Sequence, residues 1–186
     1  ADGVEFDVQL SRDGVPVVIH DETLERTTDG TGPVAGRTVA ELRTLDARNG
    51  RSDYAVTPIP TMDEVLALLA PSSVRINIEL KNSEEPYPGL EEKVVAAVRE
   101  HGLDARVVLS SFSYASIRLL HELAPDLELA TLYTRPQLQP WRTARRLGAR
   151  AVHPPVAFVP SRLWVHRAQS LGVAIRPWIV NNPPVL

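Results

Sequence analysis

The stretch VEFDVQLSRDGVPVVIHD, Val4 to Asp21, alternates apolar and polar residues and then turns back on itself. Neighbouring side chains of an extended strand point to opposite faces, so the apolar residues of Val4–Leu10 share one face, and Glu5, Asp7 and Gln9 the other. Two adjacent carboxylates repel each other, and burying either charge without compensation is expensive. A bound cation would remove both costs. The alternative is a strand whose polar face lies in water.

The segment Ser11–Gly14 is too short for a crossover helix, which needs about a dozen residues. It contains the Asp-Gly pair typical of a tight hairpin. We therefore predict that Val15–His20 runs antiparallel to Gly3–Leu10. If the Asp-Gly pair is a two-residue loop, His20 lies directly opposite Asp7 on the same face. His20 is then a candidate proton donor or acceptor, although a strand-end histidine can also simply face solvent.

A second acidic strand is predicted in RINIELKN, Arg75–Asn82, where the isoleucines and leucine form one face and the other carries Glu79 and Lys81. Together with Glu5 and Asp7, Glu79 would complete a set of three carboxylates. Oxygen ligands without thiolates favour a hard cation, Mg²⁺ or Ca²⁺, over zinc. A cation beside a lysine suits an anionic group such as phosphate. The alternative for Lys81 is an ordinary lysine at a strand end.

Strand-like and helix-like segments alternate along the rest of the chain. The acidic strand in RINIELKN is predicted to span Val74–Leu80, and further strands are predicted at Val107–Ser111, Leu127–Tyr133, Arg150–His153 and Val173–Val180. Helices are predicted at Val39–Leu45, Thr61–Ala70, Leu90–His101, Tyr114–Leu123, Pro140–Leu147 and Ser161–Leu171. Such alternation predicts an α/β fold with a parallel sheet, either doubly wound or a (β/α) barrel. We predict that residues 26–57 form a long functional loop with one short helix.

Composition narrows the functional classes. The 186 residues are 44% hydrophobic and 23% charged, as in an ordinary globular domain. The net charge of −3 argues against a general attraction to nucleic acid or anionic membranes, and the scattered arginines argue against a nucleic-acid face. The absence of cysteine excludes disulfides and thiolate metal sites. No apolar run approaches the roughly 20 residues of a membrane span. A cytoplasmic location is favoured over a secreted one.

A family resemblance follows from the same residues. The segment ADGVEFDVQLSRDGVPVVIHDETLERTTDGTGPV closely resembles the glycerophosphodiester phosphodiesterase family, and INIELKN, LSSF and WIVNN match in the same order. The resemblance covers essentially the whole chain and is thinnest between Leu127 and Ala157. It implies a TIM (β/α)8-type barrel. It also implies a phosphoric diester hydrolase of lipid metabolism that converts small-molecule glycerophosphodiesters to glycerol 3-phosphate and an alcohol.

The resemblance assigns roles to individual residues. It implies that Glu5, Asp7 and Glu79 hold one divalent cation, Mg²⁺ or Ca²⁺, and that His20 is one of two acid–base histidines. The residues that match substrate-binding positions of the family are Lys81, Phe112, Trp178 and Asn181.

The family also has segments that this sequence does not contain. They are a first strand ending in His-Arg-Gly, which carries the second histidine, and a last helix and strand. We therefore expect residues 1–186 to form a single barrel domain truncated at both ends, with about six of the eight barrel strands plus the hairpin strand. Taken alone, such a chain is expected to have little or no activity.

The sequence is also compatible with two other functions. A related barrel phosphodiesterase, such as a phospholipase-D-like lyase acting on lysophospholipid or sphingomyelin, would share the acidic set. A non-catalytic relative is the third possibility. The sequence determines neither the head-group alcohol nor the preferred metal, the compartment or the oligomeric state.

Overall fold

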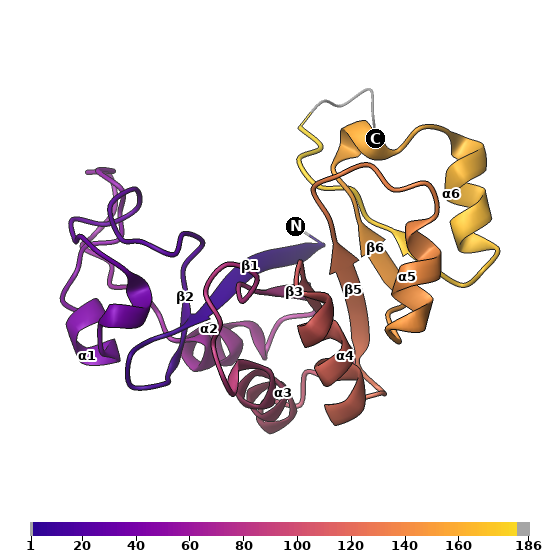
Figure 1. Ribbon diagram of the computed structural model, residues 1–186. Helices are drawn as coiled ribbons and strands as arrows, with labels where there is room; N and C mark the ends of the chain where they lie inside the picture. Colours follow the sequence, from indigo (N-terminus) through magenta and orange to yellow (C-terminus); the bar gives the residue numbers. More distant parts are fainter. Residues whose placement is uncertain (1, 182–186) are drawn as a thin grey trace. The chain divides into compact units, whose positions relative to one another are not determined.

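A computed structural model of the chain describes residues 2–181. The chain divides into two compact units, Ala1–Val107 and Val108–Leu186, which are described one at a time (Figure 1). The ends of the predicted domain, residue 1 and residues 182–186, lie outside the described residues. Between residues 2 and 181, no helix combines the length and the apolar character that a membrane span requires.

Unit 1 is built on a sheet with the strand order β2-β1-β3. Strand β1 (Gly3–Leu10) pairs with β2 (Pro16–Val18) antiparallel and with β3 (Arg75–Leu80) parallel, as predicted from the hairpin and the alternation. In Figure 1, β1 and β3 run side by side within this unit. Their apolar residues form the core, and Val8, Ile76 and Ile78 are at most 1% exposed.

The hairpin corrects one prediction. Val8 pairs with Val18, which shifts the register by one residue from the pairing of Asp7 with His20 that a two-residue loop implies. The loop has three residues: the amide of Ser11 donates to the carbonyl of Val15 at 3.0 Å, and Gly14 closes the turn with φ +74°. A turn that ends in a left-handed glycine is the usual three-residue hairpin. Because β2 ends at Val18, His20 is placed by the segment after the strand, not by strand register.

The long segment after the hairpin has a small core of its own. Short helices η1 (Val34–Gly36) and α1 (Val39–Leu42) lie within it. The buried residues that pack together here are Val17, Ile19, Leu24, Val34, Leu42 and Ile59. The segment predicted as a long loop is therefore partly folded, because its apolar residues cluster with those of the hairpin.

Two longer helices complete unit 1, α2 (Met62–Leu69) and α3 (Leu90–Glu100). The sequence Thr61-Met62-Asp63-Glu64 is typical of a capping box, and the structure contains one: the Thr61 hydroxyl accepts from the Glu64 amide, and the Glu64 carboxylate accepts from the Thr61 amide. These bonds satisfy backbone donors that the first helical turn leaves free. The start of α2 is thereby set by local sequence.

Unit 2 has the strand order β4-β5-β6-β7, and its neighbouring strands run parallel. The strands are β4 (Val107–Ser111, beginning at the boundary), β5 (Glu128–Leu132), β6 (Ala151–His153) and β7 (Ala174–Ile175). The helices are α4 (Tyr114–Leu123), α5 (Pro140–Arg146), the short η2 (Val156–Phe158) and α6 (Arg162–Gln169). The predicted βα alternation is confirmed.

The last strand is shorter than the predicted Val173–Val180. Strand β7 ends at Ile175, and beyond it only Trp178 makes an isolated bridge, to Pro155. Pro177 has no amide hydrogen to donate to a ladder, which accounts for the interruption.

Candidate active site

Three carboxylates converge in unit 1, from the two parallel strands β1 and β3. Asp7 lies directly beside Glu79 in the strand register, and Glu5 is two residues before Asp7 on the same face. One oxygen from each of Glu5, Asp7 and Glu79 lies within 4.8 Å of the others. Asp7 and Glu79 are buried, whereas Glu5 is exposed. The structure thus brings together the three residues that the sequence singled out as metal ligands.

The protonation equilibria of these groups show how crowded the acids are. Burial raises the pKa of Glu79 to about 7, and the neighbouring charges of Asp7 and Glu5 add to the effect. Burial also raises the pKa of Asp7 and, with repulsion from Asp7, that of Glu5. Ionised carboxylates in this arrangement lack sufficient positive compensation. A hard divalent cation fits the donor set, because it takes oxygen ligands and would neutralise the charge.

Lys81 supplies part of that compensation. Its Nζ lies 3.6 Å from an oxygen of Glu79, and its side chain is 14% exposed. The lysine follows Glu79 by two residues and so emerges on the same face of the chain. Its charge and that of His20 offset part of the rise in the pKa of all three carboxylates. Lys81 is therefore placed beside the acids, as expected of a group that meets an anionic substrate there.

His20 lies on the segment that follows β2, where its imidazole is held from one side. Its Nδ1 lies 2.6 Å from a carboxylate oxygen of Asp21, and Arg26 binds the same carboxylate through two hydrogen bonds. The Arg26 guanidinium, with help from His20, holds the pKa of Asp21 well below its usual range. The side chain is 60% exposed, and Nε2 is the ring nitrogen that Asp21 leaves unengaged.

Gln9 anchors the backbone that carries His20, a role that sequence reasoning missed. Its side chain is completely buried, and its amide nitrogen lies 3.1, 3.1 and 2.7 Å from the carbonyl oxygens of Ile19, His20 and Asp21. The Tyr87 hydroxyl donates to the Gln9 carbonyl oxygen at 2.8 Å. The available sequence signal for this role is that Gln9 is a polar residue on the same strand face as Glu5 and Asp7.

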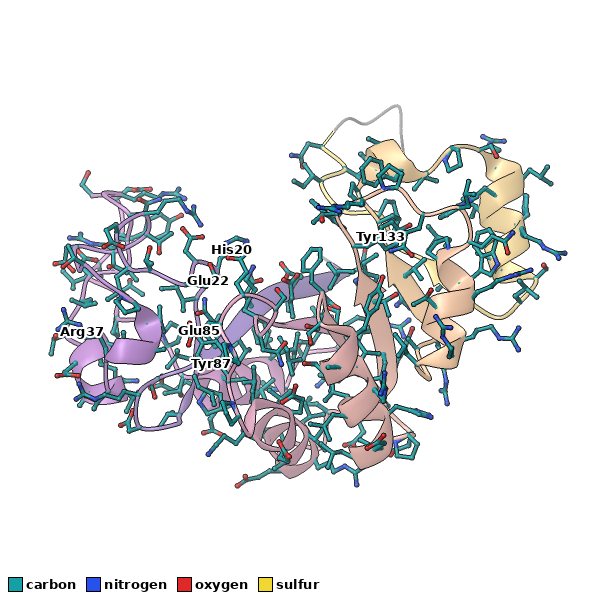
Figure 2. The ribbon with its side chains drawn as sticks, viewed as in Figure 1. His20, Glu22, Arg37, Glu85, Tyr87 and Tyr133 are labelled. Carbon is teal, nitrogen blue, oxygen red and sulfur yellow. The ribbon has the colours of Figure 1, made fainter. Side chains whose placement is uncertain are left out.

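The surroundings of this anchor are acidic. Figure 2 labels His20 and Glu22 on the segment after β2, and Glu85 and Tyr87 on the segment between β3 and α3. Burial, followed by the charges of Glu85 and Glu22, raises the pKa of Tyr87 to about 12. Tyr87 is therefore a neutral phenol that can donate its proton to Gln9 at ordinary pH.

Unit 2 brings together two other residues predicted to bind substrate. The rings of Phe112, just after β4, and Trp178, after β7, meet edge to face at 6.3 Å. The indole of Trp178 donates to the backbone oxygen of His153 at 2.9 Å. His153, at the end of β6, is itself buried. Asn181 is exposed at the end of the described chain.

Carboxylates on two parallel strands, with a lysine and an oriented histidine beside them, fit the active site of an α/β phosphoric diester hydrolase. Comparison with known sequences supports this class: the sequence model of the glycerophosphoryl diester phosphodiesterase family matches residues 1–185. The chain belongs to this family. Its fold is of the TIM (β/α)8 type, of which the described residues carry β1 and β3 in unit 1 and four parallel strands in unit 2, with β2 in addition.

Similar proteins carry consistent names. A glycerophosphodiester phosphodiesterase of Caldanaerobacter subterraneus is 40% identical over 98% of this chain and 75% of its own length, and one of Bacillus altitudinis is 41% identical over 98% and 76%. Among solved structures, an Oleispira antarctica phosphodiesterase in complex with the product sn-glycerol-3-phosphate is 28% identical. It aligns with a TM-score of 0.86 over 99% of this chain and 75% of its own. A glycerophosphodiester phosphodiesterase of Agrobacterium tumefaciens reaches 0.80 at 30% identity, covering 95% and 74%.

Proposed function

We propose that this chain carries the cation-dependent half of a site that hydrolyses glycerophosphodiesters to glycerol 3-phosphate and an alcohol. The observation that carries the proposal is the convergence of Glu5, Asp7 and Glu79 within 4.8 Å, beside Lys81 and His20. The product-bound relative of Oleispira antarctica supports the choice of substrate class.

Glu5, Asp7 and Glu79 would hold one divalent cation, either Mg²⁺ or Ca²⁺. When bound, such a cation polarises a phosphoryl oxygen and stabilises the negative charge that develops on it. Lys81 binds the same phosphate group from the protein side, because its ammonium is held close to Glu79. The substrate is thereby oriented by contacts to its charged part, and Phe112, Trp178 and Asn181 are assigned to the rest of it on the family resemblance.

His20 handles a proton in the proposed reaction. Asp21 engages Nδ1, so Nε2 can donate a proton to the oxygen of the leaving alcohol or accept one from attacking water. A second histidine for the complementary step is expected from the family's His-Arg-Gly strand, which this sequence does not contain. We therefore propose that full turnover needs that strand.

The test measures products from two substrates. The 186-residue chain, and a version extended by the family's first strand and last helix and strand (the complete protein), are incubated with glycerophosphocholine, and separately with lysophosphatidylcholine, in the presence of Mg²⁺ or Ca²⁺. Release of glycerol 3-phosphate from glycerophosphocholine is expected from the complete protein. Exclusive action on lysophosphatidylcholine, with a cyclic product, would instead identify a lyase. Cation binding without turnover of either substrate by the complete protein would identify a non-catalytic relative.

His20→Ala tests the proton-transfer role. The substitution should lower kcat of the complete protein by roughly 10²–10⁴-fold, because general acid–base catalysis usually contributes a rate enhancement of that size. The cation affinity should be nearly unchanged. His166→Ala, at an exposed position on α6, is the matched control and should have no such effect. Equal turnover in the His20 variant removes this residue from the mechanism.

A further inference from the structure

The chain has an uneven distribution of charge that its net charge conceals. After Glu128 the sequence contains no aspartate or glutamate, whereas eight arginines lie between residues 129 and 186. The overall value of −3 therefore combines an acidic majority of the chain with a purely basic final third. Such asymmetry is typical of a chain with a surface for an anionic partner.

Half of those arginines gather at one groove in unit 2, so this part of the basic set is not scattered as the sequence suggests. The groove lies between the start and outer face of α5 and the end of α6, and has a volume of about 620 Å³. Its lining includes Arg142, Arg145, Arg146 and Arg167. Among residues 2–181, no carboxylate lies within ion-pair distance of any of these four. Guanidinium groups without carboxylate partners can bind phosphate through two hydrogen bonds each.

Two strongly exposed leucines lie on the segments that form this groove. Leu138, which precedes α5 and lines the groove, is 89% exposed, and Leu163 in the first turn of α6 is 78% exposed. Leu138 is held against α6, because the indole of Trp164, the residue after Leu163, donates to the backbone oxygen of Leu138 at 3.1 Å. The rings of Trp141 and Trp164 also meet edge to face at 5.2 Å. The leucines are thus presented on a supported surface.

We propose that this surface of unit 2, formed by Leu138, Leu163 and the four groove arginines, docks on an anionic lipid bilayer. The arginines would bind lipid phosphates, and the leucines would enter the boundary between headgroups and acyl chains. This inference goes beyond the hydrolytic function and does not depend on it.

Other anionic partners fit the surface less well. A free phosphate ester would use the arginines but leaves the exposure of Leu138 and Leu163 unexplained. Single-stranded nucleic acid is bound by aromatic rings on which bases stack, but Trp141 is only 4% exposed. Aliphatic side chains in water beside unpaired arginines are the combination that an anionic membrane interface accommodates.

Vesicle cosedimentation tests the proposal without any need for turnover. The chain is expected to sediment with vesicles of phosphatidylglycerol in phosphatidylcholine, to remain free with pure phosphatidylcholine, and to dissociate as ionic strength rises. The double substitution Arg145→Gln/Arg146→Gln should weaken partitioning by roughly tenfold or more. Arg118→Gln/Arg150→Gln removes the same charge from other exposed positions of unit 2 and should change partitioning little.

The leucines are tested in the same assay. Leu138→Ser/Leu163→Ser should reduce partitioning several-fold, whereas Leu68→Ser, which alters an equally exposed leucine of unit 1 (76%), should not. Circular dichroism establishes that each variant folds, as expected for exposed positions. Equal binding to neutral vesicles, unchanged binding of both the Arg145→Gln/Arg146→Gln and the Leu138→Ser/Leu163→Ser variants, or equally tight binding to a DNA duplex at the same salt would overturn the proposal.

Discussion

At the residue scale, Glu79 is the most constrained of the three clustered acids. It is buried, lies directly beside Asp7, and has a pKa raised to about 7. Glu79→Gln keeps its shape but removes a charged ligand, so we expect the affinity for Mg²⁺ or Ca²⁺ to fall by at least about tenfold. Isothermal titration of the protein with each cation measures this. Glu84→Gln, at an exposed position, removes the same charge and should leave the affinity unchanged.

Gln9 gives a second prediction at this scale. Gln9→Met preserves size but leaves three carbonyl groups and the Tyr87 hydroxyl without their shared partner. Unpaired buried groups cost about 1–3 kcal/mol, and the segment carrying His20 should loosen. We expect kcat of the complete protein to fall by roughly tenfold with little change in cation affinity.

Tyr87→Phe is a milder variant against which the effect of Gln9→Met on kcat can be compared. It removes only the donor to the Gln9 carbonyl oxygen and leaves the contacts of Gln9 to the backbone after β2 in place. Its effect on kcat should therefore be smaller than that of Gln9→Met. If both variants lose stability but neither loses kcat, Gln9 stabilises the fold without positioning His20.

At the element scale, the hairpin between β1 and β2 depends on one residue. Gly14 has φ +74°, and a Cβ added there would meet no atom closer than 3.8 Å, so backbone strain is the main cost of any side chain. Gly14→Ala should lower the free energy of unfolding by about 1 kcal/mol. Gly14→Asn should lose less, because asparagine tolerates the left-handed region. Denaturant unfolding measures both, and equal losses would contradict the conformational explanation.

Most element boundaries were predictable because their signals are local. The capping box at Thr61 begins α2, and left-handed glycines at 102, 148 and 172, with φ of 63°, 78° and 74°, follow the ends of α3, α5 and α6 within three residues. The register of the hairpin could not be predicted from the sequence, because an Asp-Gly pair is compatible with a loop of two or of three residues. His20 still lies near the acids, because Gln9 gathers the backbone that follows the strand.

At the scale of the whole molecule, His153 should make stability depend on pH. It is buried at the end of β6, and burial, followed by the charge of Arg176, lowers its pKa to about 4. Arg176 is paired with Glu128. In the unfolded chain the same imidazole takes up a proton near pH 6.5.

Because the pKa of His153 is lower in the folded state than in the unfolded state, the folded protein should become less stable as the pH falls. As the pH falls from about 6.5 to about 4, the unfolded state binds a proton at this imidazole that the folded state does not bind. The free energy of unfolding therefore falls by about 3 kcal/mol. Above about pH 6.5 this histidine contributes no pH dependence. Denaturant midpoints across this range should fall less steeply for His153→Gln than for the unaltered chain. Parallel curves for the two proteins would show that His153 takes up its proton in the folded state.

The sequence alone determined the family, the strand–helix alternation and the acidic face of β1, because these depend on local pattern and on side-chain alternation along a strand. Only the tertiary structure decided that Asp7 and Glu79 lie side by side, that Gln9 and Tyr87 hold the segment bearing His20, and that four arginines of α5 and α6 share one groove. The reason is physical. Each of these features depends on contacts between residues far apart in the chain, whose geometry is set by packing and by buried hydrogen bonds.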